Sequence, residues 1–349
     1  MSKKFCIVIL ACAAIAAPLA ASAHEVYVLS RSEIAQAVWS PSPNPFSAIP
    51  SQEKLFLIWG TIVAVSLLLV LTASVTPLFE RVFDPLLSRL KKYAPLVGRL
   101  TFGLALIYSG YHGAFFGPEL PVAATMPAGL AQLIGVALMI GGFMVCIGFL
   151  TRLVSVVALV VYAYAVLMYG TYMLTYLNYL GEIILFIILG GGIWSVDSAL
   201  PFFRTTSRRL KRFGRRLEKY SFFILRLCFG TALFYASFYA KFLHSNLALD
   251  TVNDYHLTNY FHFTPLFLVL GAFLIEALLG LCFAAGFEIR FAALFFTFFL
   301  TLSIMFFGEA VWPHIILFGV NIALFFHGYD QYTLEMKLIQ RARKGEPVL

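Results

Sequence analysis

Residues 99–115, RLTFGLALIYSGYHGAF, and residues 226–242, RLCFGTALFYASFYAKF, are two copies of one apolar helix. Eight of the seventeen positions are identical. The likeness continues at a constant spacing of 138 residues, where four residues recur in order: Gly142, Gly148, Phe149 and Arg152 become Gly280, Gly286, Phe287 and Arg290. Shared apolar composition alone does not preserve such a spacing, so the sequence predicts an internal duplication.

The composition around this repeat is typical of a membrane protein. Hydrophobic residues make up 61% of the chain and charged residues only 12%, with a mean hydropathy of +0.87. Nine stretches after residue 54 are long enough to cross a hydrocarbon core of about 30 Å. They lie near 55–77, 100–118, 127–150, 153–174, 176–197, 221–243, 264–286, 291–308 and 311–328. We therefore expect an all-α polytopic membrane protein with nine transmembrane helices after signal cleavage.

The N-terminus resembles a secretory signal peptide. Lys3 and Lys4 precede an apolar stretch that ends in Ala21-Ser22-Ala23, so the mature chain is expected to begin at His24. Two alternatives stay open: an uncleaved first anchor, or cleavage at Cys12 as a lipoprotein.

The distribution of basic residues predicts the orientation. Residues 204–219 contain eight Lys or Arg, residues 81–99 contain five, and the tail after residue 331 adds four. By the positive-inside rule, the mature N-terminus lies outside and the C-terminus lies in the cytoplasm, across the inner (cytoplasmic) membrane of the cell. The net charge of +8 is then explained by anionic membrane lipids as partners, and it does not indicate nucleic acid.

These features divide the chain into eight parts. They are a signal peptide (1–23), an extracytoplasmic strap (24–54), an extra transmembrane helix (55–77), a cytoplasmic connector (78–98), a first four-helix unit (99–198), a basic cytoplasmic connector (199–220), a second four-helix unit (221–330) and a cytoplasmic tail (331–349). Because each unit has an even number of spans, the two four-helix bundles form a tandem parallel repeat.

Four ionisable residues fall inside predicted spans, where burial of a charge is costly: His112, Glu182, Lys241 and Glu276. At a rise of 1.5 Å per residue, all four lie about 20–22 Å from the cytoplasmic ends of their helices and therefore in one layer. We expect this layer to be a ligand or proton site, with Lys241 and Glu276 paired because their helices are consecutive and antiparallel. A purely structural ion pair, or a coincidence of depths, remains an alternative.

Other polar residues point to simpler roles. Arg99, Arg152, Arg226 and Arg290 mark cytoplasmic helix ends and are expected to anchor them at the interface. His24 with a free amine is a weak candidate for copper, but no tight histidine spacing supports a metal site. Cys146, Cys228 and Cys282 lack CxxC partners, and no haem, flavin or iron–sulfur motif is visible.

The motifs together resemble the DoxX family of small four-span membrane proteins. The second unit carries the pattern on two successive helices: Arg226, Gly230, Phe234 and Lys241, then Glu276, Gly280, Gly286 and Arg290. The first unit keeps Arg99, Gly103, Gly142, Gly148 and Arg152, but it has Ala114 and Leu138 in place of the Lys and the Glu. The two units cover roughly two-thirds of the chain.

The resemblance implies membrane redox chemistry, because the family is similar to a subunit of a thiosulfate:quinone oxidoreductase. We therefore expect a quinone-associated subunit in which Glu276 and Lys241 bind or protonate the quinone headgroup. A redox partner protein would supply electrons, so the chain would not be a complete enzyme alone. Two alternatives stay open: a carrier or exporter of a small solute, and a non-enzymatic membrane scaffold.

Overall fold

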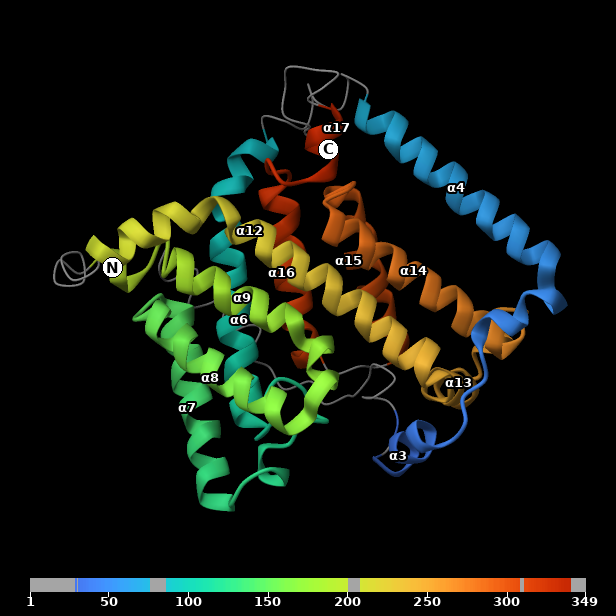
Figure 1. Cartoon of the computed structure of the whole chain (residues 1–349), viewed down its shortest axis with the longest axis horizontal. Helices are drawn as coiled ribbons and strands as arrows, with labels where there is room; N and C mark the ends of the chain where they lie inside the picture. The colour runs from blue at the N-terminus through green and yellow to red at the C-terminus, as the bar shows by residue number, and fades with distance from the viewer. Residues whose placement is uncertain (1–28, 30, 76–85, 200–207, 308–310, 340–349) are drawn as a thin grey trace.

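The computed structural model is helical (Figure 1) and describes residues 29, 31–75, 86–199, 208–307 and 311–339. The predicted signal peptide, Cys12 and His24 lie outside the described residues. The prediction of an all-α chain is confirmed. Six helical runs in the described chain are long and apolar enough to cross a membrane, as expected of a multi-pass membrane protein.

The helices of the first unit are α6 (Ala94–Tyr111), α7 (Ala128–Ile147), α8 (Thr151–Tyr169) and α9 (Leu177–Leu189), with a 3-10 segment η5 (Gly170–Tyr176) between the last two. Those of the second unit are α12 (Arg208–Ser237), α14 (Pro265–Ala285), α15 (Ile289–Phe307) and α16 (Ile315–His327). A π-helical segment, η6 (Phe238–Leu243), continues α12. Between η6 and α14 lie α13 (Ser245–Asp254) and the 3-10 turn η7 (Leu257–Asn259).

Each of the nine predicted spans contains a helix, but the helices differ in length. Helices α9 and α16 have 13 residues each, or about 20 Å, which is less than a full hydrocarbon core. The run Thr151–Leu189 joins α8 and α9 over 39 residues. Helix α12 begins at Arg208, inside the segment expected to be a connector, and continues without a break into the span.

Equivalent residues of the two units form equivalent helix junctions. Gly148 and Gly286 end α7 and α14 in the left-handed conformation, each with φ of 71°. Two residues later, Leu150 and Glu288 also have positive φ, of 48° and 47°. Glycine is favoured where a helix must end in this way, because it has no Cβ to clash.

The first two helices of each unit pack through glycines. A Cβ on Gly103 would lie 2.6 Å from the carbonyl oxygen of Gly142, and a Cβ on Gly230 would lie 2.5 Å from that of Gly280. No real Cβ tolerates such distances, so the glycines let α6 approach α7, and α12 approach α14, backbone to backbone.

The fourth helix of each unit packs against the first helix of the other unit. Helix α9 packs mainly on α12 and α16 packs on α6, whereas α9 touches α6, and α16 touches α12, much less. Figure 1 shows α9 running beside α12. The two units therefore exchange their fourth helices and share one hydrophobic core.

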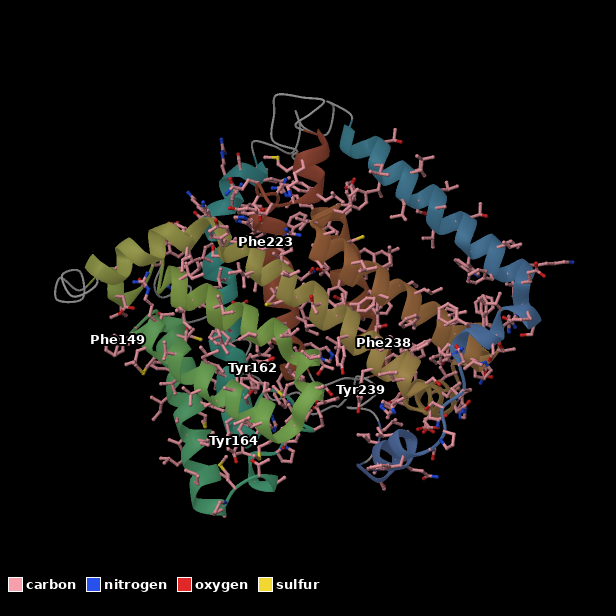
Figure 2. All side chains as sticks on the ribbon, viewed as in Figure 1. Phe149, Tyr162, Tyr164, Phe223, Phe238 and Tyr239 are labelled. Atoms are coloured by element: carbon pink, nitrogen blue, oxygen red, sulfur yellow. The ribbon has the colours of Figure 1, made fainter. Side chains whose placement is uncertain are left out.

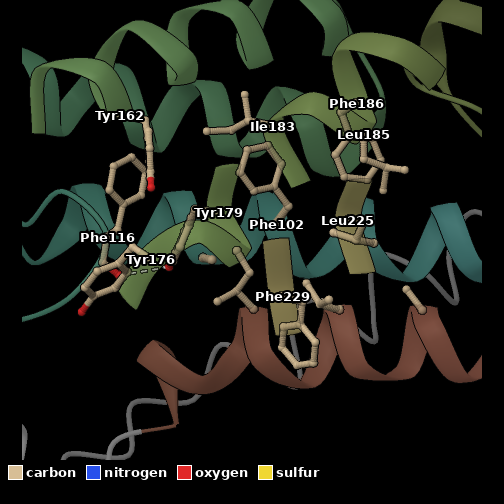
Figure 3. Packing of buried hydrophobic residues seen from close by; sticks show 14 of the residues in the cluster. Phe102, Phe116, Tyr162, Tyr176, Tyr179, Ile183, Leu185, Phe186, Leu225 and Phe229 are labelled. Atoms are coloured by element: carbon tan, nitrogen blue, oxygen red, sulfur yellow. Dashed lines mark hydrogen bonds between the residues drawn. The ribbon is translucent and has the colours of Figure 1, made fainter. Parts of the chain in front are cut away.

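Aromatic side chains fill this shared core. Phe102 of α6 stacks on Phe186 of α9 with ring centroids 5.8 Å apart, and Leu225 and Phe229 of α12 lie in the same cluster (Figure 3). All four are fully buried. The core thus combines residues from both copies of the repeat, which makes the two units one packing unit.

The N-terminal segment lies across one end of the helices. Helix α3 (Arg31–Trp39) packs on α13, and the 3-10 turn η1 (Pro45–Ala48) packs on α14. Ser245 donates a hydrogen bond to the carbonyl of Pro43 at 2.6 Å. After a second 3-10 turn, η2 (Pro50–Gln52), helix α4 (Glu53–Val75) stands apart from the other helices (Figure 1), with mostly exposed apolar side chains. This exposure suits a helix that faces lipid.

Candidate functional site

Lys241 and Glu276 form a buried ion pair. Lys241 Nζ lies 2.9 Å from Glu276 Oε2, and the side chains are only 4% and 9% exposed. The structure thus brings together the two residues that the sequence pairs. Lys241 belongs to the π-helical segment η6, which Phe238 and Tyr239 begin (Figure 2), and such segments often occur at functional sites.

Local contacts fix the two helices that carry the pair. One turn before Lys241, Ser237 donates a hydrogen bond to the carbonyl of Phe273, one turn before Glu276, at 3.2 Å. Both groups of this bond are buried. Just below, the Gly230–Gly280 contact holds α12 and α14 close together. The pair therefore sits where two helices have little freedom to move apart.

The ion pair opens onto a cavity of about 280 Å³ inside the second unit. Most of its wall is apolar and aromatic, with Phe296, Phe299 and Phe307 contributed by α15. Its polar lining consists of the pair and the side chains of Thr251, Ser303 and His314. A cavity with apolar walls and a few converging polar groups is the usual form of a small-molecule site, although the volume of this one is just below the usual range of about 300–1,000 Å³.

Helix α13 forms the roof of this cavity. Ala248, Thr251 and Val252 line the cavity from above, and Thr251 is itself held by a hydrogen bond to the carbonyl of Leu247. The other face of α13 is acidic. Burial, together with the nearby carboxylates of Asp254 and Glu33, raises the pKa of Asp250 there.

The spans predicted from the sequence, 221–243 and 264–286, leave residues 244–263 outside any helix, so they do not predict α13. The signal was present, because Leu247, Ala248, Thr251 and Val252 recur at helical spacing and are all buried. His314 was also missed. It is buried in the 3-10 turn η8 (Trp312–His314) that precedes α16, where it lines the cavity.

The first unit has no ion pair at the equivalent place. Ala114 packs with Leu104, Trp312 and Ile315, and Leu138 joins the shared core. Both are buried. Two apolar residues thus occupy the positions that Lys241 and Glu276 hold in the second unit, so the polar site is present in only one copy of the repeat.

Neither of the other two predicted site residues lines the cavity, and Glu182 lies outside the expected polar layer. His112 ends α6, is exposed, and stacks on Trp312 with ring centroids 4.7 Å apart. Glu182 is fully buried on α9 beside Gly98, near the start of α6. The predicted depth of Glu182 is wrong because the predicted span runs to residue 197, whereas Gly190 already ends α9.

The four arginines gather at the end of the molecule opposite α13, hereafter the arginine end. Arg226 donates to the carbonyls of Phe283 and Ala284 at 2.8 and 2.7 Å, and to that of Tyr332 at 3.4 Å. Arg99 donates to the carbonyls of Gly191, Ile193 and Trp194. Arg152 and Arg290 donate to carbonyls at the ends of α9 and α16. The arginines therefore satisfy carbonyls that helix ends leave unpaired.

Within the part of the chain that the structure describes, no group of three His, Cys, Asp or Glu side chains is arranged to hold a metal ion. Comparisons of the chain with protein-family models, with curated proteins and with solved structures found no match. The polar cavity of the second unit is therefore the candidate site on the strength of its own geometry.

Proposed function

We propose that this chain is a DoxX-like subunit of a membrane redox system and binds an isoprenoid quinone beside Lys241 and Glu276. The observation that carries the proposal is the ion pair opening onto an aromatic cavity. A quinone headgroup has carbonyl oxygens that accept from an ammonium group, and its reduced form has hydroxyls that donate to a carboxylate. The apolar walls suit the ring and the start of its isoprenoid tail.

The proposal includes a topology. The nine helices would cross the inner membrane with the arginine end in the cytoplasm and the mature N-terminus outside. The cavity would then lie in the outer half of the bilayer, under a roof formed by α13. A redox partner protein would supply electrons, because the proposal gives this chain no electron carrier of its own.

The test is the quinone content of the full-length protein, measured by mass spectrometry after purification in mild detergent. Wild type is expected to retain one quinone per chain, and Glu276→Gln is expected to lose it at equal folded yield. Glu119→Gln is the matched control. Glu119 is also a partly buried carboxylate, but it accepts hydrogen bonds from Tyr172 and Tyr176, away from the cavity. Equal quinone content in wild type and Glu276→Gln would overturn the assignment.

The same cavity supports a second candidate function, a carrier or exporter of a small solute. The observation in its favour is the separate roof, because a short helix that covers a polar cavity can act as a gate. Solute flux into proteoliposomes that requires Glu276, without bound quinone, would favour this function. Stable purification with one partner protein and no response to small molecules would instead favour a scaffold.

A further inference from the structure

A second buried carboxyl lies apart from the cavity, in the core that the two units share. Glu182 of α9 is fully buried, and neither of its carboxyl oxygens has a hydrogen-bond partner among the described residues. Its neighbours in the core cluster include Tyr179, Ile183 and Phe186. An ionised carboxylate in such apolar surroundings costs many kcal/mol unless a cation or several donors compensate it.

Three arginines on the helices that pack against α9 are engaged elsewhere. Arg99 of α6, Arg152 of α8 and Arg226 of α12 all donate to backbone carbonyls at the arginine end. His327 of α16 stacks face to face on Phe222, with ring centroids 3.7 Å apart. Cys228 of α12 lies beside Gly181 of α9 and is a free thiol. Nothing among these residues stabilises a negative charge on Glu182.

The surroundings of Glu182 nevertheless leave room for its carboxyl group. A Cβ on Gly98 would lie 3.1 and 3.2 Å from the two carboxyl oxygens, so the glycine of α6 provides the space they occupy. One turn earlier on the same face of α9, the side-chain oxygen of Asn178 is also buried without a partner among the described residues. Buried polar groups in proteins are usually hydrogen-bonded, so two unpartnered ones in the same part of the core need an explanation.

We propose that Glu182 is a proton-binding site: the side chain carries a proton in the resting protein and exchanges it with solvent. The ligand of this site is a proton, and the site is independent of the proposed quinone. Because Glu182 is fully buried, exchange requires a transient opening between α9 and the helices around it. Proton exchange at Glu182 therefore also reports motion at the contact between the two units.

Infrared difference spectroscopy of the full-length protein in mild detergent tests this proposal. The spectrum of wild type minus Glu182→Gln should contain the C=O stretching band of a protonated carboxylic acid, and this band should shift to lower frequency in D2O. Glu182→Gln resembles the protonated form in shape and charge, so it is expected to fold. If Glu182→Gln does not fold, Glu182→Asp replaces it in the difference spectrum. The carboxylic acid band should then change its frequency between wild type and variant.

Two results would overturn the proposal. The lack of a carboxylic acid band would mean that Glu182 is ionised and has a cationic partner. A band that does not shift in D2O would mean that the proton of Glu182 does not exchange with solvent and that the residue has a purely structural role. The control is Glu119→Gln, which leaves Glu182 intact, so its spectrum should retain the band that Glu182→Gln loses. Neither result depends on whether the cavity binds quinone.

Discussion

At the scale of single residues, the Lys241–Glu276 pair is costly to place in the membrane, because two charges must leave water. Their attraction offsets much of that cost only while both are present. Removal of Lys241 takes this partner from the buried carboxylate of Glu276, at a cost of about 3–5 kcal/mol. The first unit already contains the apolar alternative, with Ala114 and Leu138 at the same positions.

This comparison predicts a thermodynamic cycle. Lys241→Ala should lower the free energy of unfolding by about 3–5 kcal/mol, whereas Lys241→Ala combined with Glu276→Leu should recover most of the loss. Thermal unfolding in one detergent at one protein concentration measures all four proteins of the cycle. The double variant should be stable and yet lose the ligand of the cavity. A double variant as unstable as the sum of the single changes would show that the two side chains act independently.

At the scale of helices, glycines set the distance between the first two helices of each unit. In the second unit, Gly230 of α12 faces Gly280 of α14 at a contact where backbone meets backbone. Added atoms cannot be accommodated there by rotation of a side chain. The helices must separate, and the Ser237–Phe273 hydrogen bond and the Lys241–Glu276 pair further along would separate with them.

Gly230→Ala should therefore destabilise the protein by about 1–3 kcal/mol through overpacking. The chain offers a matched control in Gly271, which lies on α14, where a Cβ would have no atom of the described residues within 4 Å. Gly271→Ala should leave stability unchanged or raise it by up to about 1 kcal/mol, because alanine favours helix more than glycine does. The unfolding temperature and the quinone content should both fall for Gly230→Ala, and neither should fall for Gly271→Ala. Equal effects of the two changes would argue against the close contact.

At the scale of the whole molecule, the sequence predicts the features that depend on residues close together in the chain. It does not predict the features that depend on contacts between distant segments. The ends of α7 and α14 follow from Gly148 and Gly286, and the meeting of Lys241 with Glu276 follows from two consecutive helices. The position of Glu182 does not follow, because it depends on where Gly190 ends α9. The exchange of fourth helices is equally hidden, since apolar faces of similar composition give no sign of which helix each will meet.

The exchange places α9 of the first unit against α12 of the second, and one native cysteine allows this to be tested. A Cβ on Gly181 would lie 3.0 Å from Cβ of Cys228, slightly closer than the separation of about 3.5–4.5 Å in ordinary disulfides. Gly181→Cys should therefore form a disulfide with Cys228 under mild oxidation, after a small shift of the helices. In this variant, Cys6, Cys12, Cys146 and Cys282 are replaced by alanine to remove the other cysteines of the sequence.

A site for a specific protease, inserted within residues 200–207, converts the disulfide into a difference in size. After cleavage, the two halves should migrate as one species on a denaturing gel without reductant, and as two species with it. Gly129→Cys in the same background is the control. It also lies in the first half of the chain, on α7, but no described atom lies within 4 Å of a Cβ there, so its halves should separate in both conditions. Separation of the Gly181→Cys halves without reductant would show that α9 does not pack against α12, and each unit would then form its own bundle.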